Sequence, residues 1–554
     1  MRLYEYMRIY YPISLPTKVE NVYETIKRLS LDLLKRHLKP NEKGANVTGG
    51  IIFDAYMAST YLIACKLSSM NNCKYASEVR KWLEQVVTLG ATHSFTVWSK
   101  NLDTYIKLAL RGLDQNLLDT LDDPFSCLMF AHVNKQCLKI ADVFPPPELV
   151  VFGWRKIMNM PPWAVPGILT AVLHVELSKK TSLIRLKPLI YLVTKYYKKV
   201  FNQFDVAFAN FHQTVIQALV FENLYKLTRN DFYLHIAQRS WWLINSLVEP
   251  TGYVTRFRYP VWDTAWSVLA LKHVPSEGDV VQNLINYLIG TQQKDGGWAF
   301  THIRHPSDND DTALALLALL ETSTERNVEK GINFLLANQR KDGGWATYYK
   351  GNKSKPRGAV PSIRVNPWYT QLDVPVADIT SHVVWALSNY YKRTQKYNVA
   401  KAIEKAIEWM YNDTVWEGGY GYLYGRWCQT FIPATASAVL ALNEAINSGA
   451  ITNNKSDAEY LLENYVKWIK RICNGGCGED PESYHVGKPI ISEPTIEHTA
   501  FAYLALRTIG ESINIQNFID IAAMKKLEQS INMTAFDVYI NTVMPYYIDF
   551  INIK

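Results

Sequence analysis

A seven-residue segment occurs twice in the second half of the chain, and this repeat restricts the fold more than any other feature of the sequence. Residues 292–298 read QQKDGGW, and residues 339–345, which lie 47 positions later, read QRKDGGW. Weaker copies follow at residues 416–420 and 474–478. A period of this length is typical of stacked helical hairpins, because one hairpin cannot bury its apolar face without a neighbour.

Each copy separates two helical patterns of different character. The patterns before the copies are amphipathic, as in an outer layer that faces water on one side; they cover residues 281–291, 328–338, 400–412 and 458–472. The patterns after the copies are apolar nearly all round, as in an inner layer; they begin near residues 311, 379, 435 and 499. We therefore predict hairpins that close into an α/α toroid, with a positive φ in each Gly-Gly turn. A generic helical solenoid is the alternative.

The 554 residues divide near an EPTG segment at residues 249–252. Residues 1–249 show helical patterns with weaker repeats, and residues 250–554 hold the strong repeats. We predict one all-α, barrel-like domain in each part. Within the first part, residues 184–201 mix aliphatic, aromatic and basic side chains. A charged outer helix is favoured there over a helix that lies on lipid headgroups.

The composition narrows the class of protein. Aromatic residues make up 13% of the chain, so rings either fill large cores or line a cavity. The net charge of +8 comes from scattered basic residues, which argues against nucleic acid and leaves an anionic membrane surface or substrate open. Seven cysteines without regular spacing indicate reduced thiols and no zinc site. No apolar segment reaches the ~18 to 20 residues of a membrane span, so we expect a protein of the cytoplasm or of a membrane face.

Three carboxylates stand together where one of the inner helices begins, in residues 308–312, which read DNDDT. A helix N-cap would explain them as structure. An EF-hand would need Gly and Glu where Ala313 and Leu319 stand. The alternative with chemical content is a Brønsted acid, because crowded carboxylates in a low-dielectric pocket cannot all ionise and one keeps its proton.

Two further features favour the acid. Asp378 and His382 are four residues apart on another inner helix, hence on one face, although such a pair is often only a buried structural contact. Aromatic faces stabilise a buried cation without offering it a nucleophile, although for any single ring a place in the core is the favoured interpretation. The rings expected on the inner side are Trp163, Trp262, Phe300, Tyr348 and Trp427. A strong acid in a dry, ring-lined cavity is what carbocation chemistry on an alkene requires.

Taken together, these motifs resemble those of the class II terpene cyclases, and within them the squalene–hopene cyclases. The similarity is clear from about residue 250 to 510 and collinear before that. The matching motifs are DxDDTA at 308–313, the QW-type repeats at 292–298 and 339–345, PVWDT at 260–264, GRW at 425–427, the DxxxH pair Asp378 and His382, and a remnant of GGWGED…SY at 475–484.

The resemblance implies a role for each site residue. Asp310 would be the proton donor, Asp308 and Asp311 its supporting carboxylates, and His382 with Asp378 the pair that tunes and reprotonates it. The five rings named above would stabilise cations. The family fold implies two α/α barrels that enclose a central apolar cavity, in many members on a membrane face, with no metal. The chain departs from the family at residues 428–435, where Pro433 replaces a tyrosine hydroxyl.

The leading prediction is an enzyme, an intramolecular cyclase of the isomerase or lyase type. It would protonate a linear polyprene, with a squalene-type C30 hydrocarbon as the first choice and no cofactor. The alternative is a cyclase of a C15 or C20 prenyl diphosphate with Mg²⁺, for which a basic loop could hold the diphosphate; its residues are Lys353, Lys355, Arg357 and Arg364. A non-catalytic α/α binding scaffold is a third reading. The sequence is also compatible with a homodimer and with binding to a membrane surface.

Overall fold

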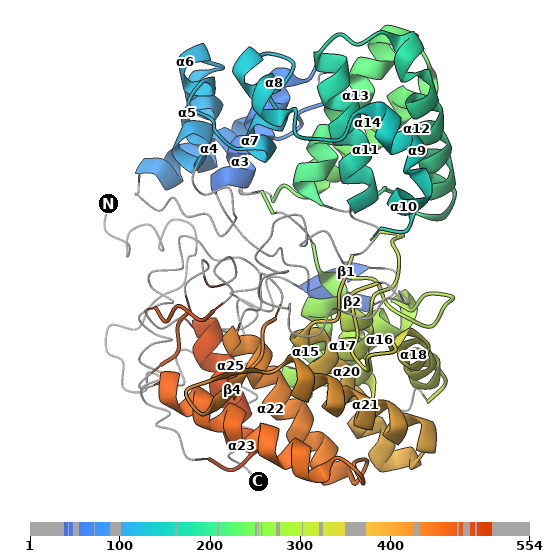
Figure 1. The fold of residues 1–554 in the computed structure, drawn as a ribbon, viewed down its shortest axis with the longest axis vertical. Coiled ribbons are helices and arrows are strands. Elements are labelled where there is room, and N and C mark those ends of the chain that lie inside the picture. The colour runs from blue at the N-terminus through green and yellow to red at the C-terminus, as the bar shows by residue number, and fades with distance from the viewer. Residues whose placement is uncertain are drawn as a thin grey trace. The chain divides into compact units, whose positions relative to one another are not determined.

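The computed structural model describes residues 38–41, 44–47, 55–70, 72–88, 101–160, 164–208, 210–249, 252, 254–255, 258–272, 278–301, 303–320, 325–348, 373–425, 431–473, 476–479, 483, 488–492 and 496–511. The chain divides into two compact units (Figure 1). Unit 1 consists of Met1–Gly49, Tyr259–His302 and Pro306–Lys554; unit 2 consists of Gly50–Arg258 and Ile303–His305. The predicted all-α class is confirmed, because the described strands form only two short hairpins.

Unit 2 is built from helices alone in its described part. They are α3 (Ala55–Leu67), α4 (Ala76–Thr88), α5 (Leu102–Arg111), α6 (Gln115–Leu118), α7 (Pro124–Leu128), α8 (Lys135–Ala141), α9 (Pro147–Phe152), α10 (Trp154–Met158), α11 (Ala164–Ser178), α12 (Leu183–Gln203), α13 (Phe211–Thr228) and α14 (Asp231–Ser246). Helix α13 packs against α3, α11 and α14. Its buried Glu222 accepts hydrogen bonds from Ser68, Ser69 and the Trp241 indole, so a carboxylate joins three segments of this core.

Unit 1 contains two layers of helices and two small hairpins. The inner helices are α15 (Pro260–Leu271), α17 (Asn309–Leu319), α20 (Ala377–Thr394), α22 (Phe431–Ser448) and α25 (Ile496–Thr508). The outer helices are α16 (Gly278–Thr291), α18 (Glu325–Asn338), α21 (Tyr397–Asp413) and α23 (Lys455–Ile472). The hairpins pair β1 (Leu38–Asn41) with β2 (Gly44–Val47), and β3 (Val415–Glu417) with β4 (Tyr420–Tyr422). The sequence did not predict the β1–β2 hairpin, which packs on α15 and α16.

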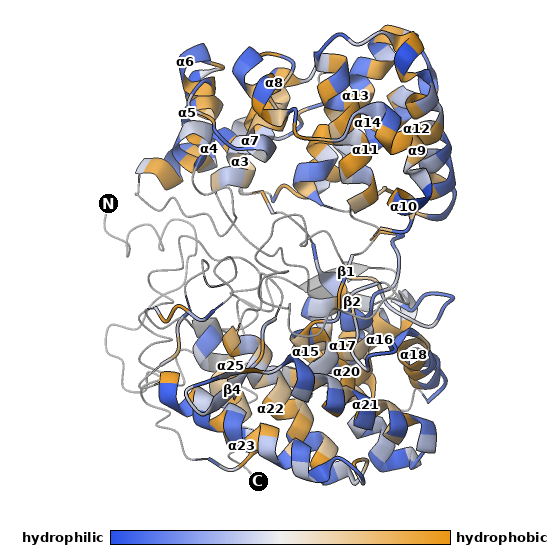
Figure 2. Ribbon diagram, viewed as in Figure 1, coloured by the Kyte–Doolittle hydropathy of each residue, from blue (hydrophilic) through white to orange (hydrophobic). Residues whose placement is uncertain are grey.

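The inner helices form a closed row. Each packs on the next along the chain, and each outer helix packs mainly on the inner helix that precedes it in the sequence. The rings of Trp266 on α15 and Phe501 on α25 lie 6.0 Å apart, so the first and last of these helices also meet. All eleven residues of α17 are buried, whereas α18 buries one face (Figure 2). This two-layered ring is the arrangement that the repeats predict.

The Gly-Gly turns hold neighbouring hairpins together. Gly296 and Gly343 have φ of 91° and 99°, and a Cβ on either would collide with a carbonyl of the next outer helix, so the predicted positive φ is confirmed. The amide of Gln292 donates to the carbonyls of Gly296 and Asn327, each at 2.8 Å. Gln339 bonds its own turn and the next outer helix in the same way. The repeated glutamine therefore links one hairpin to the next.

A threonine sets the same register in four inner helices. Its hydroxyl accepts a hydrogen bond from a backbone N–H of the preceding turn, at 2.9 to 3.1 Å. The donor and acceptor pairs are Trp298 and Thr312, Trp345 and Thr380, Leu423 and Thr435, and Cys477 and Thr499. Residues at equal distances from these threonines therefore occupy equivalent places. The residues two positions before Thr312, Thr380 and Thr435 are Asp310, Asp378 and Pro433. The residues two positions after the four threonines are Leu314, His382, Ser437 and Phe501.

Two disulfides correct the expectation that the cysteines are reduced. Cys65 pairs with Cys73 and Cys473 with Cys477. Each pair brackets a chain reversal at a helix end, which brings the Cα atoms to 5.8 and 4.5 Å, within the range that a disulfide bridges. Two buried cysteines of unit 2, Cys127 and Cys137, are free. None of the described helices is both long and apolar enough to cross a bilayer.

Candidate active site

Asp308 caps the N-terminus of α17 and orders the turn that precedes it. One carboxylate oxygen accepts from the Asp311 N–H at 2.8 Å, and the other accepts from the Phe300 N–H at 3.2 Å. Its own N–H donates to the carbonyl of Trp298 at 2.8 Å. The helix cap considered for this motif is therefore present, and Asp308 is the residue that forms it. The cap is therefore formed by Asp308 and not by Asp310 or Asp311.

Asp310 makes the central contact of the site. Its Oδ1 lies 2.7 Å from Nδ1 of His382, and the two side chains are 3% and 1% exposed. The contact joins α17 to α20, which pack side by side. Sequence spacing pairs His382 with Asp378 instead. The structure brings His382 directly to Asp310, and Asp378 lies fully buried one turn earlier on α20.

The His382 ring is enclosed by two more helices. Trp266 of α15 meets it edge to face, with ring centroids 5.9 Å apart and planes at 80°. Ser437 of α22 places its Oγ 3.4 Å from Nε2 of His382. Sequence reasoning missed both residues. The position of the threonines could have identified them, because Trp266 and Ser437 each follow an inner-helix threonine by two positions, as His382 does.

Tyr348 lies close to the acid motif. Burial and, after it, the nearby carboxylates of Asp308 and Asp311 raise the pKa of Tyr348 well above its usual value of 10, so the phenol stays neutral. Asp373 accepts from the backbone N–H of Tyr348 at 2.7 Å. The Asn309 N–H donates to the carbonyl of Thr347 at 2.9 Å, which attaches the start of α17 to this segment. No pattern in the sequence pointed to Asp373.

Two of the predicted rings accompany the acid. Trp262 is buried on α15, and its ring lies 6.0 Å from that of Trp266, which contacts His382. Phe300 is buried in the turn whose N–H is held by Asp308, and its ring lies 5.1 Å from that of Tyr259. Trp163 and Trp427 lie outside the described residues.

The chemistry available here is acid–base chemistry in a dry setting. Asp308, Asp310, Asp311 and Asp378 are at most 4% exposed. A buried carboxylate is costly unless it is paired or carries a proton. Across the described ranges, no three His, Cys, Asp or Glu side chains come together as a metal site. The predicted central cavity and the basic loop at residues 353–364, which also lies outside the described residues, stay predictions.

The helical ring and the buried contact between Asp310 and His382 agree with the class that the motifs indicate, the class II terpene cyclases. Residues 258–532 match the family model of the squalene-hopene cyclase C-terminal domain. Residues 258–532 therefore carry a domain of the class II terpene cyclase family.

Two curated relatives each match 46% of the chain. A probable squalene–hopene cyclase of Sinorhizobium fredii is 27% identical over 284 residues, which are 46% of this chain and 41% of the relative. A squalene–hopene cyclase of Bradyrhizobium diazoefficiens is 27% identical over 280 residues, covering 46% of this chain and 40% of the relative. The match thus spans about two fifths of the length of these relatives.

Solved structures show weaker likeness over more of the chain. An ent-copalyl diphosphate synthase from Streptomyces platensis covers 95% of this chain and 99% of its own, with 14% identity and a TM-score of 0.49. A type II terpene cyclase from Scytonema, in complex with geranylgeranyl dihydroxybenzoate, covers 49% of this chain and 70% of its own, with 17% identity and a TM-score of 0.32. The fold class given above rests on the helices of the chain and on the family model.

Proposed function

We propose that this protein catalyses the protonation-initiated cyclisation of a linear polyprene. The observation that carries the proposal is the buried hydrogen bond between Asp310 and His382. When the Nδ1–H of His382 donates to one oxygen of Asp310, the other oxygen can hold the proton that is delivered. A hydrogen bond from a cationic donor stabilises the carboxylate that remains, so it strengthens the acid.

The proposed reaction moves one proton in and one out. The carboxyl of Asp310 gives its proton to a terminal alkene carbon or an epoxide oxygen, which leaves a tertiary carbocation and the carboxylate. The remaining double bonds attack in turn, and each ring closure moves the positive charge along the chain. Loss of a proton or capture of water then ends the sequence. His382 returns a proton to Asp310, and the proton released at the end of the sequence replaces the one that His382 gave. Asp378 lies one turn earlier on the same helix as His382.

The neighbouring rings suit a cationic intermediate. The faces of Trp262, Phe300 and Tyr348 offer π-electron density to a cation but no reactive lone pair of a base. The raised pKa of Tyr348 matters here, because a neutral phenol does not trap the cation as a phenolate would. Asp308 keeps this arrangement in place through the turn that carries Phe300.

We propose a squalene-type C30 hydrocarbon as the substrate, with no cofactor. Support comes from the curated relatives, which are named squalene–hopene cyclases, and from the Asp378–His382 pair and the PVWDT segment at residues 260–264. The second candidate is a C15 or C20 prenyl diphosphate with Mg²⁺, which the basic loop at residues 353–364 favours.

One assay tests the activity and separates the substrates. Purified protein is incubated with squalene, oxidosqualene, geranylgeranyl diphosphate and farnesyl diphosphate, with and without Mg²⁺, and the products are identified by mass spectrometry. We expect Asp310→Asn to abolish cyclisation while Asp413→Asn, a buried acid on the outer helix α21, retains it. Wild-type turnover by Asp310→Asn would show that the acid is assigned wrongly.

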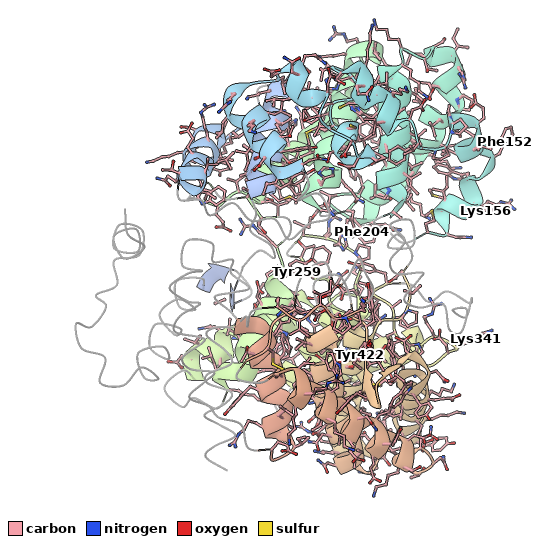
Figure 3. The ribbon with its side chains drawn as sticks, turned by 60° about the vertical axis from the view of Figure 1, so that its left-hand side comes forward. Phe152, Lys156, Phe204, Tyr259, Lys341 and Tyr422 are labelled. Carbon is pink, nitrogen blue, oxygen red and sulfur yellow. A yellow bond between two sulfur atoms is a disulfide. The ribbon has the colours of Figure 1, made fainter. Side chains whose placement is uncertain are left out.

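We also propose that unit 2 attaches to a lipid surface. Helices α9 and α12 pack together and expose apolar side chains: Phe152 is 87% exposed, Ile184 86% and Leu149 61%. The adjacent α10 exposes Lys156, and Figure 3 shows Phe152 and Lys156 projecting outward. Apolar side chains flanked by lysines are typical of peripheral attachment to anionic lipid.

Co-sedimentation with phosphatidylglycerol vesicles tests the attachment. The double variant Phe152→Asp/Ile184→Asp should lose vesicle binding, and Trp242→Ser, which changes an exposed ring on α14, should keep it. If the double variant still binds vesicles, or if light scattering shows that these residues instead hold a homodimer, the attachment proposal is wrong.

A further inference from the structure

His382 has two ring nitrogens, and each has a polar partner on a different helix. Nδ1 lies 2.7 Å from Oδ1 of Asp310 on α17, and Nε2 lies 3.4 Å from Oγ of Ser437 on α22. His382 and Ser437 are each 1% exposed. Within the part of the chain that the structure describes, these two oxygens are the hydrogen-bond partners of the ring.

We propose that Ser437 is a positioning residue whose hydroxyl holds the His382 ring with Nδ1 toward Asp310. The inference rests on the proposed function, in which Asp310 is the proton donor. In this role Ser437 transfers no proton to the substrate. It acts through the imidazole.

The need for a hydroxyl follows from the donors of the ring. A protonated imidazole carries an N–H on both nitrogens, and a buried N–H without an acceptor is destabilising. Asp310 accepts from the N–H at Nδ1, and Oγ of Ser437 accepts from the N–H at Nε2. When the ring is neutral and Nε2 lacks its hydrogen, the same hydroxyl can rotate and donate. An alanine at this position could do neither.

The surroundings leave this task to Ser437 on its helix. Pro433, one turn earlier on α22, has no polar side-chain atom. The hydroxyl of Thr435 is engaged by the N–H of Leu423 at 3.0 Å. Trp266 covers another side of the ring, edge to face. Without the Ser437 hydroxyl, rotation of the ring about its bond to Cβ would no longer be opposed by a second hydrogen bond.

Kinetics of three serine variants provide the first test. Ser437→Ala should lower kcat about tenfold with KM unchanged, which corresponds to one lost hydrogen bond to a charged group. Ser437→Thr, which keeps a hydroxyl, should recover most of the rate. The control is Ser381→Ala, the buried neighbour of His382 whose hydroxyl donates to the Ala377 carbonyl of its own helix. It should retain the wild-type rate, and circular dichroism should show all variants folded.

A spectroscopic test does not depend on turnover. In protein with ¹⁵N-labelled histidine, the His382 ring signals are identified by their absence in His382→Gln. We expect Ser437→Ala to move these signals and Ser381→Ala to leave them in place. Unchanged ring signals in Ser437→Ala would overturn the proposal, even if the rate fell. Moved signals in a protein that cyclises none of the substrates would support the role of Ser437 and reject the proposed function instead.

Discussion

Two successive hairpins of unit 1 share one backbone arrangement and differ at the candidate active site. In the first hairpin the N–H of Asp308 donates to the Trp298 carbonyl, and in the second the N–H of Val376 donates to the Trp345 carbonyl. Asp308 also caps its helix through its side chain, which Val376 does not. In the second hairpin Asp373 binds the backbone N–H groups after the tryptophan, as Asp308 does in the first.

The two inner helices differ at one further position. Asp310 on α17 and Asp378 on α20 stand at the same distance from their threonines, but Leu314 stands where α20 has His382. The histidine of the second hairpin reaches back to the aspartate of the first. The repeated hairpins therefore provide equivalent positions for side chains. The candidate site forms between two neighbouring hairpins and not within one of them.

The largest expected effect comes from replacing His382 with the leucine that stands at the equivalent position of α17. His382→Leu gives α20 the residue that α17 carries, so Asp310 loses its contact with the imidazole. Turnover should fall about 100- to 10,000-fold, the usual contribution of a proton-transfer group. Product formation under saturating substrate measures the loss. His235→Leu, an exposed histidine on α14, serves as the control, and a rate for His382→Leu close to that of the control would mean that the copies do not differ in function at this position.

The two repeated tryptophans, Trp298 and Trp345, should contribute equally to the stability of the fold. Trp298 and Trp345 are fully buried, and each indole donates to a carbonyl of its own outer helix, at 2.7 and 2.8 Å. Changing either to Ala should lower the free energy of unfolding by about 3–5 kcal/mol. Urea unfolding followed by circular dichroism measures the two losses. A loss in one variant only would show that the copies are not equivalent supports.

The fourth copy sharpens the comparison. Cys477 stands where the first two copies have tryptophan and is bonded to Cys473. A disulfide across so short a loop contributes about 2 kcal/mol, less than a buried tryptophan does. Cys477→Ser should therefore lower the midpoint of thermal unfolding less than Trp345→Ala does. A reducing agent should lower the midpoint of the wild type more than that of Cys477→Ser, in which only the Cys65–Cys73 disulfide is left to reduce. Equal midpoints for reduced and oxidised wild type would contradict this.

The smallest expected effect concerns the cap. Asp308→Ala removes a side-chain cap and should lower the free energy of unfolding by about 1 kcal/mol, together with a fall in turnover, because the turn that carries Phe300 loosens. Asp373→Ala should cost similar stability with a smaller fall in turnover, since its hydrogen bonds lie in the second hairpin. Thermal unfolding and the cyclisation assay measure both. Equal falls in turnover would show that the two acids serve the site equally.

Much of unit 1 was readable from the sequence. The outer patterns predicted at 281–291 and 458–472 correspond to α16 (Gly278–Thr291) and α23 (Lys455–Ile472). Asp310 and His382 were both singled out, each from its own local motif. Only the family resemblance associated His382 with Asp310. The spacing along one helix favours the pair Asp378 and His382, and it cannot bring together two residues that lie 72 positions apart.

What the sequence determined by itself was local and periodic: the two helix types, the turns that need positive φ at Gly296 and Gly343, and the crowding of acids at residues 308–311. These follow from each segment's own side chains and their period. Only the tertiary structure decided which groups meet: the contact of Asp310 with His382, the placement of Ser437 beside the second ring nitrogen, and the disulfides. Such contacts depend on the register between packed helices, and a shift of one residue would turn each of these side chains to another face.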